Sequence, residues 1–182
     1  EQEELNFFLA YHDTLTNLYN RAYFLLKTEE KLAAMTQQET GVLVLSDLNF
    51  FKIINDTYGH QIGDDVLVHT ATILRDMVKS PNIVARLGGD EFIMHIPDND
   101  EQNVRAFIDS IRYQFSVRPF VKDQLVIEVI PSFGFTMIGE DDTYEITYQL
   151  ADAAMYEDKR IIKEARAKKE RQQAEVLVST VS

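Results

Sequence analysis

Two adjacent carboxylates follow two glycines in the segment Gly88-Gly89-Asp90-Glu91, a combination that could form a metal-binding or catalytic site. Apolar residues precede this segment at 83–85 and follow it at 92–94. The pattern predicts a β-hairpin with Gly-Gly-Asp-Glu at its tip, because glycine allows positive φ and close approach of another molecule. Acids beside bare backbone suit a divalent metal that carries a phosphorylated substrate. An ordinary solvated turn explains the same residues, so this segment alone leaves both interpretations open.

A third acid, Asp47, directly follows the apolar, β-rich run at 42–45. An acid where a buried strand ends is costly unless it faces solvent or binds a cation, and α/β sheets commonly place ligands at such ends. Together with Asp90 and Glu91 it would form an oxygen-ligand site for Mg²⁺, which takes one or two carboxylates, water and substrate phosphates. Taken alone, Asp47 is better explained as a helix-capping residue.

Four segments, in order and in register, resemble the motifs of the GGDEF domain of bacterial diguanylate cyclases: Asp13–Arg21, Asp47–Asp64, Arg86–Phe92 and Asp152–Lys159. The resemblance runs from about residue 11 to residue 163. It implies an α/β (α+β) fold with a palm-like mixed β-sheet of about five strands flanked by helices, as in nucleotidyl cyclase catalytic domains. It also implies a nucleotidyltransferase that joins two GTP molecules into cyclic di-GMP and releases two pyrophosphates.

The resemblance assigns metal and catalytic roles to individual residues. Asp47, the Leu48 backbone carbonyl, Asp90 and Glu91 would bind Mg²⁺, with Mn²⁺ as an alternative ion. Asp90 would accept the proton of the attacking hydroxyl, and Glu91 would support the metal or that hydroxyl. Lys52 would contact the polyphosphate and stabilise the transition state, although its residue type and position also fit a solvated helix lysine.

The substrate residues implied for GTP are Phe50, Phe51, Asn55, His60, Asp64, Arg86, Lys159 and Lys163. Asn55 can both donate and accept, and the Asp64 carboxylate accepts from the two donors on the guanine edge, so the pair favours guanine over adenine. Asp64 also fits an acid in the first turn of a helix, stabilised by the helix dipole. His60 also fits a structural role in the turn after Gly59.

The chain departs from the family pattern at three places. Lys163 stands where the family often has the Arg of a Gly-Arg-Asn ending, and this chain has Ile161-Ile162-Lys163 there instead. An ammonium point charge thus replaces a guanidinium that could make a bidentate contact. Asn49 stands where a second Asp is usual. Lys79-Ser80-Pro81-Asn82 replaces the Arg-x-x-Asp inhibitory site, which loses both the guanidinium and the carboxylate. We therefore expect weak or absent product inhibition through that site.

The bulk properties are those of one compact domain with short extensions. The chain has 182 residues, 45% hydrophobic and 26% charged, with a net charge of −12. This charge argues against nucleic-acid binding, and it means that local cations and metal must hold an anionic nucleotide. No apolar stretch approaches membrane-spanning length, so we expect no membrane contact by this domain. The lack of cysteine excludes disulfides and thiolate metal sites and fits a cytoplasmic location.

Residue patterning predicts the elements that must position these groups. Helices are expected at 21–35 with Asn20 as N-cap, at 63–78, at 104–117 and at 146–167. Strands are expected at 42–48, on both sides of the Gly-Gly tip, at 125–130 and at 133–138. We expect residues 1–11 to end an upstream signalling helix or linker, 12–165 to form the catalytic domain, and 166–182 to be a helical extension or linker.

Three functions remain open at this stage. The first is a cyclase that works as a two-fold homodimer with one GTP per subunit, under control of an upstream sensory domain. The second is a catalytically weak or inactive module that binds GTP or a protein partner as a regulator, favoured by Asn49 and Lys163. The third is a cyclase with relaxed base choice, which Asp64 disfavours.

Overall fold

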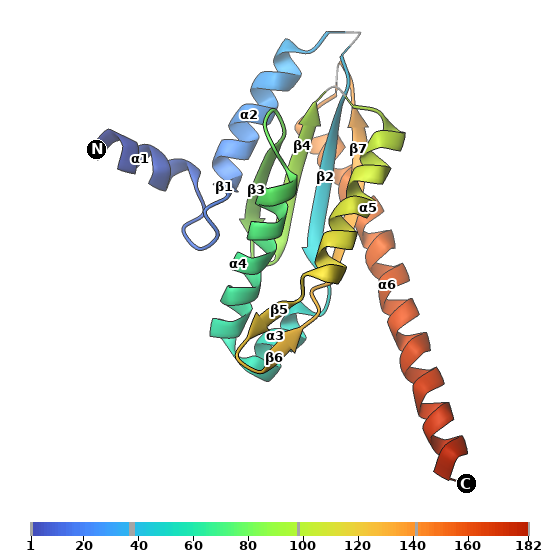
Figure 1. Ribbon diagram of the computed structural model, residues 1–182. Helices are drawn as coiled ribbons and strands as arrows, with labels where there is room; N and C mark the ends of the chain where they lie inside the picture. Colours follow the sequence, from blue (N-terminus) through green and yellow to red (C-terminus); the bar gives the residue numbers. More distant parts are fainter. Residues whose placement is uncertain (1, 37–38, 98, 141, 182) are drawn as a thin grey trace.

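A five-stranded mixed sheet forms the centre of the molecule in the computed structural model, which describes residues 2–36, 39–97, 99–140 and 142–181 (Figure 1). Its strands are, in spatial order, β1 (Tyr19–Asn20), β3 (Ile83–Gly88), β4 (Glu91–Pro97), β2 (Gly41–Leu48) and β7 (Pro131–Ile138). Only β1 and β3 pair in parallel; the other neighbours are antiparallel. The predicted fold class is confirmed.

Helices cover both faces of this sheet, because successive side chains of a strand point to opposite faces. On β2, Val42 and Val44 join the core under α4 (His60–Met77) and α5 (Glu101–Val117). Leu43 and Leu45 join the core under α2 (Arg21–Ala34) and α6 (Tyr144–Val181). In Figure 1, α4 and α5 lie in front of the sheet and the first turns of α6 lie behind it.

The lower end of Figure 1 holds α3 (Phe51–Tyr58) and a separate hairpin of β5 (Phe120–Lys122) and β6 (Leu125–Ile127). The expected strand at 125–130 is therefore too long, and it does not belong to the central sheet. The fifth strand of that sheet is β1 instead. With only two residues, β1 has no periodicity that a sequence pattern could reveal.

Helix boundaries agree with their capping residues. Asn20 caps α2 and accepts a hydrogen bond from the Tyr23 backbone N–H, as expected. In contrast, α4 begins at His60, three residues before the expected start, because Gly59 turns the chain with a φ of 85°. Asp64 is therefore the fifth residue of α4, and its explanation as a first-turn acid is wrong. At the other end, α6 runs without a break past residue 165.

The contact between α6 and the sheet is unusually close at Gly134 of β7. A Cβ at this position would lie 2.0 Å from the Met155 backbone nitrogen and 2.2 Å from the Ala151 carbonyl oxygen. Glycine thus lets the backbone of α6 rest directly on the strand. This contact sets the position of the α6 residues that follow, including Asp152 and Lys159.

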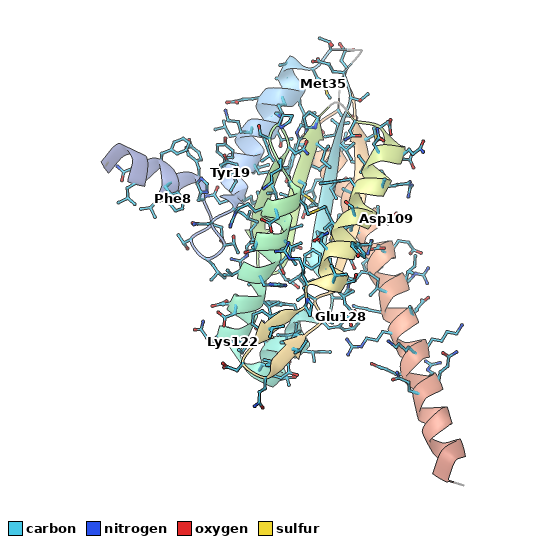
Figure 2. The ribbon with its side chains drawn as sticks, viewed as in Figure 1. Phe8, Tyr19, Met35, Asp109, Lys122 and Glu128 are labelled. Atoms are coloured by element: carbon cyan, nitrogen blue, oxygen red, sulfur yellow. The ribbon has the colours of Figure 1, made fainter. Side chains whose placement is uncertain are left out.

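The first helix, α1 (Gln2–Tyr11), projects away from the sheet, with Phe8 on its surface (Figure 2). Leu5, Phe7 and Leu9 are about half exposed. Rings of Tyr11 and Tyr23 meet edge to face and connect α1 to α2. Within the described residues, no helix combines the length and apolar character that crossing a bilayer requires.

A buried histidine, His95, lies in the middle of β4 and is 2% exposed. Its Nδ1 lies 3.5 Å from the Lys31 Nζ. Burial, together with the nearby ammonium, lowers the pKa of His95 from 6.5 to about 4. The native protein therefore holds this imidazole neutral at pH values where the unfolded chain protonates it.

We expect this histidine to destabilise the protein on acidification. Above pH 6.5 the imidazole is neutral in both the folded and the unfolded protein, and the full stability is present. As pH falls from 6.5 towards 4, protonation of the unfolded chain alone lowers the free energy of unfolding. The shift corresponds to about 3 kcal/mol. Urea unfolding measures the free energy of unfolding at pH 7 and at pH 4. Between these pH values it should fall by about 3 kcal/mol less in His95→Gln than in wild type. His60→Gln, at an exposed position, serves as control, and equal losses in wild type and His95→Gln would contradict the assignment.

Candidate active site

Three carboxylates gather where β2 ends and β4 begins. Asp47 and Glu91 are cross-strand partners, and Asp90 immediately precedes Glu91 in the turn after β3. Gly88 and Gly89 adopt φ values of 142° and 52°, which confirms the expected glycine hairpin. Two strand ends far apart in sequence thus bring the three predicted acids to one place.

The acids repel one another, and their pKa values show it. Burial, and then the charge of Asp47, raise the pKa of Asp90 above its ordinary value. Burial raises the pKa of Glu91 as well, with further contributions from Asp47, Asp90 and Asp152. Burial and the neighbouring carboxylates thus both disfavour the charged forms of Asp90 and Glu91.

One cation does reach the cluster. Lys159 of α6 donates from Nζ to the Asp47 Oδ1 at 2.5 Å, and Asp47 is 8% exposed. The predicted substrate residue Lys159 is thus placed beside the predicted metal residue Asp47. In this arrangement its ammonium stabilises a buried carboxylate rather than pointing freely to solvent.

The fit of this cluster to Mg²⁺ depends on the substrate. Within the described residues, no group of three or more His, Cys, Asp or Glu side chains could hold a metal ion. Mg²⁺ needs only one or two protein carboxylates when phosphate oxygens and water complete its shell. A cation shared in this way would stabilise the disfavoured charged forms of Asp90 and Glu91. The ligand set of Asp47, the Leu48 carbonyl, Asp90 and Glu91 stays a prediction.

Arg86 bonds to two residues that no local sequence pattern indicates as its partners. Its NH1 lies 3.0 Å from the Asp13 Oδ1, and its Nε and NH2 donate to the Gly89 carbonyl at 2.9 and 2.8 Å. The side chain is 12% exposed. Arg86 thus holds the glycine hairpin, and its predicted phosphate contact would require these bonds to be exchanged.

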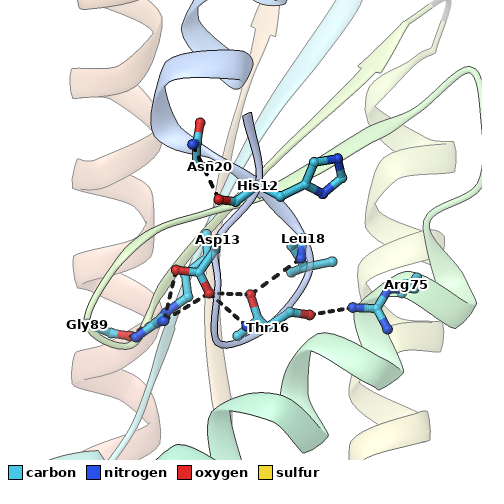
Figure 3. A network of polar contacts seen from close by, with 8 residues as sticks. His12, Asp13, Thr16, Leu18, Asn20, Arg75 and Gly89 are labelled. Carbon is cyan, nitrogen blue, oxygen red and sulfur yellow. Dashed lines mark hydrogen bonds and ion pairs between the residues drawn. The ribbon is translucent and has the colours of Figure 1, made fainter. Parts of the chain in front are cut away.

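Asp13 connects this hairpin to the loop that contains Thr16, between α1 and β1. Its Oδ1 accepts from the Thr16 backbone N–H at 2.8 Å and from the Thr16 hydroxyl at 2.6 Å. Burial alone would raise the pKa of Asp13, but the hydrogen bonds from Thr16 and Arg86 bring it below its ordinary value. Arg75 of α4 donates to the Thr16 carbonyl and extends the network (Figure 3). The segment Asp13–Arg21 contains Asp13, but the charge of Asp13 alone does not identify Arg86 as its partner.

The first residues of α3 lie outside the acid cluster. Lys52 is 87% exposed and pairs with Asp56 one turn along the same helix, at 3.1 Å. Phe50 adopts a left-handed conformation with φ of 64°, and the guanidinium of Arg166 lies 4.1 Å from its ring centre. Lys163 is exposed on α6. The structure does not join Lys52 or Lys163 to the three acids.

The predicted base-recognition residues meet where α3 and α4 adjoin. Asn55 of α3 faces Gly63 of α4, and the exposed Asp64 follows Gly63 directly. His60 is exposed at the start of α4. Phe51 is half-buried and packs against the core. This set surrounds the two-helix junction, apart from the acids.

Two functionally placed residues had no role in the sequence analysis. Asp152 adds to the raised pKa of Glu91, after burial and the charges of Asp47 and Asp90, so its charge acts on the acid cluster. The signal that could have identified Asp152 was its position in the segment Asp152–Lys159, seven residues before Lys159 on one predicted helix. Gly134 sets the position of that helix. A single glycine in an apolar strand indicates close backbone approach, but it does not identify the partner.

Comparison with known proteins identifies the family of the chain. Residues 10–165 match the family described as "Diguanylate cyclase, GGDEF domain". The response regulator PleD of Caulobacter vibrioides is 35% identical over 156 residues, which cover 83% of this chain and 34% of PleD. The probable diguanylate cyclase DgcT of Escherichia coli is 32% identical over 155 residues, with the same coverage of 83% and 34%. The chain thus spans about a third of the length of these relatives.

Solved structures show the same fold. The coiled coil and GGDEF domain of DgcB from Caulobacter crescentus, crystallised in complex with c-di-GMP, superimposes with a TM-score of 0.81 and 31% identity over 87% of this chain and 85% of that one. The diguanylate cyclase SiaD of Pseudomonas aeruginosa, in complex with its activator SiaC, gives a TM-score of 0.78 and 30% identity, covering 87% and 63%.

Proposed function

The chain belongs to the GGDEF family of diguanylate cyclase domains, and we propose that it condenses two GTP molecules into cyclic di-GMP with release of two pyrophosphates. One observation supports this proposal most: Asp47, Asp90 and Glu91 share one end of the sheet, where burial, and then the neighbouring acids, raise the pKa values of Asp90 and Glu91. Carboxylates gathered beside a glycine-rich hairpin tip are suited to bind a metal ion that carries a triphosphate substrate.

Each residue of the cluster has a separate task in this proposal. Asp47, the Leu48 carbonyl, Asp90 and Glu91 would hold Mg²⁺ or Mn²⁺, which when bound neutralises charge on the triphosphate. Asp90 accepts the proton of the attacking ribose 3′-hydroxyl, because a raised pKa makes its carboxylate a stronger base than an exposed aspartate. Lys159 holds the buried Asp47 in place through their ion pair.

Substrate binding involves the residues around α3 and α6. Asn55 and Asp64 recognise guanine, while Phe50, Phe51 and His60 line the approach to the base and ribose. Lys52 and Lys163 are exposed cations and can turn to the phosphates without losing a buried partner. Arg86 contributes by holding Gly89, whose neighbour Asp90 is the proton acceptor.

The proposal includes a two-fold dimer, since one subunit binds one GTP and the reaction joins two. The half-exposed Leu5 and Leu9, one turn apart on α1, are suited to helix pairing that sets how the two sites meet. An upstream sensory domain would act through this helix. We infer a cytoplasmic location, where GTP is available.

Incubation of the purified protein with GTP and Mg²⁺, followed by chromatography for cyclic di-GMP and pyrophosphate, tests this function. Competition by ATP measures the base preference. A second candidate function, a regulatory module that binds GTP without turnover, is favoured by the exposed Lys163, where a guanidinium is usual in the family. GTP binding without product would select that alternative, and absence of both would refute the two together.

We expect little product inhibition through the segment 79–82. The Lys79 Nζ donates to the Arg75 carbonyl at 3.0 Å, so this amine stabilises the end of α4 and offers no bidentate contact. Calorimetric titration of cyclic di-GMP without turnover should show no micromolar binding at this segment. Micromolar binding that Lys79→Ala abolishes would overturn the expectation.

A further inference from the structure

Gly63 leaves room for one particular side chain. A Cβ built at Gly63 would lie 1.8 Å from the Asn55 Oδ1, 2.9 Å from the Asn55 Cγ and 3.4 Å from the Phe51 Cζ. The first two distances are too short for any real contact, so the amide of Asn55 occupies the space of a residue-63 side chain. Gly63 is buried in α4, and its φ does not demand glycine. Space for Asn55 is therefore the structural reason for glycine here.

The same contact orients the amide. Asn55 Oδ1 is buried and lacks a hydrogen-bond partner, whereas Nδ2 is not among the buried, unpartnered atoms of the described residues. The oxygen therefore faces Gly63, and the NH₂ group is the part of the amide that remains able to donate to a ligand. Burial of an unpaired acceptor is unfavourable, so the arrangement persists only because the helix packing holds the amide there.

We propose that Gly63 is a positioning residue that sets base specificity: it holds Asn55 with its NH₂ group directed to the bound base beside Asp64. This inference rests on the proposed use of GTP. Guanine carries an acceptor at O6 and donors at N1 and N2, which match one amide donor and one carboxylate. Adenine carries a donor at its 6-amino group, which would meet the Asn55 donor and leave Asp64 unpaired.

A double-mutant cycle tests this assignment. Binding of a non-hydrolysable GTP analogue and of the matching ATP analogue is measured for wild type, Gly63→Ala, Asn55→Ala and the double variant. Gly63→Ala should weaken GTP-analogue binding about tenfold to a hundredfold and reduce the preference over ATP. In the Asn55→Ala background the same change should cost less than about twofold, because the group that Cβ would displace is absent.

Thermal unfolding of the four proteins gives a readout that needs no nucleotide. Gly63→Ala should lower the melting temperature in the wild-type background and raise it in the Asn55→Ala background, where only the better helix propensity of alanine remains. Val68→Ala, at a more exposed site of the same helix, serves as control and should leave analogue binding unchanged.

The outcomes separate the two hypotheses. Gly63→Ala that keeps both affinity and base preference would overturn the positioning role and leave the proposed function intact. Additive effects in binding and in melting temperature would also overturn it, because the two residues would then act independently. A folded wild-type protein that binds neither analogue would refute the proposed function, and with it the guanine role of Gly63.

Discussion

Replacing Asp90 by Asn should lower the rate of cyclic di-GMP formation by at least about a hundredfold. The substitution keeps the shape of the side chain but removes both the proton acceptor and one negative charge from the cluster. Purified variant and wild type are compared by initial rates of pyrophosphate release at saturating GTP and Mg²⁺. GTP-analogue binding through Asn55 and Asp64 should weaken less than turnover, because those residues lie at the α3–α4 junction.

The stability of the variant distinguishes lost chemistry from lost structure. Burial, and then the charge of Asp47, raise the pKa of Asp90, so its carboxylate is disfavoured in the folded protein, and Asn at position 90 removes both costs at neutral pH. The melting temperature without metal should therefore be unchanged or higher. Asp109→Asn on the exposed side of α5 is the matched control and should retain activity (Figure 2). More than a tenth of wild-type activity in Asp90→Asn would contradict its role as proton acceptor.

Gly134→Ala should be the most destabilising single-methyl addition among the glycines. The new Cβ would meet the Met155 nitrogen at 2.0 Å and the Ala151 carbonyl oxygen at 2.2 Å, and backbone atoms inside a helix cannot rotate away. Helix α6 must shift off the sheet, at a cost of about 3 kcal/mol or more. Urea unfolding measures this loss directly.

Gly139→Ala is the matched control, since it adds the same methyl group just beyond the end of β7. Among the described residues, its Cβ would approach nothing closer than the Asp142 Oδ2 at 3.9 Å, so the free energy of unfolding of this variant should change little. Activity of Gly134→Ala should fall even where the protein remains folded, because a shifted α6 moves Asp152 and Lys159 away from Glu91 and Asp47. Equal stability of the two variants would show that α6 packs differently on the strand.

Local sequence patterns were sufficient to predict many of the helices, strands and turns of this domain. The Gly-Gly-Asp-Glu hairpin, the Asn20 cap and the strand that ends at Leu48 depend on local conformational preference and on apolar periodicity within about ten residues. These local features placed Asp47, Asp90 and Glu91 at strand ends. The errors also had local causes. Strand β1 is too short to show periodicity, and the turn at Gly59 lets α4 begin at His60, earlier in the chain than expected.

Pairings between distant residues were decided by the tertiary structure alone. Arg86 bonds to Asp13, 73 positions away, and Lys159 to Asp47, 112 positions away. Both bonds arise because the sheet order and the path of α6 bring separate segments together, and no local pattern encodes a specific partner at such distance. The same reason explains why a glycine at 63 or 134 could be noticed in the sequence, while the atom that fills its space could not. The sequence thus determined which groups are present and on which elements, and the packing of helices on the sheet decided which of them meet.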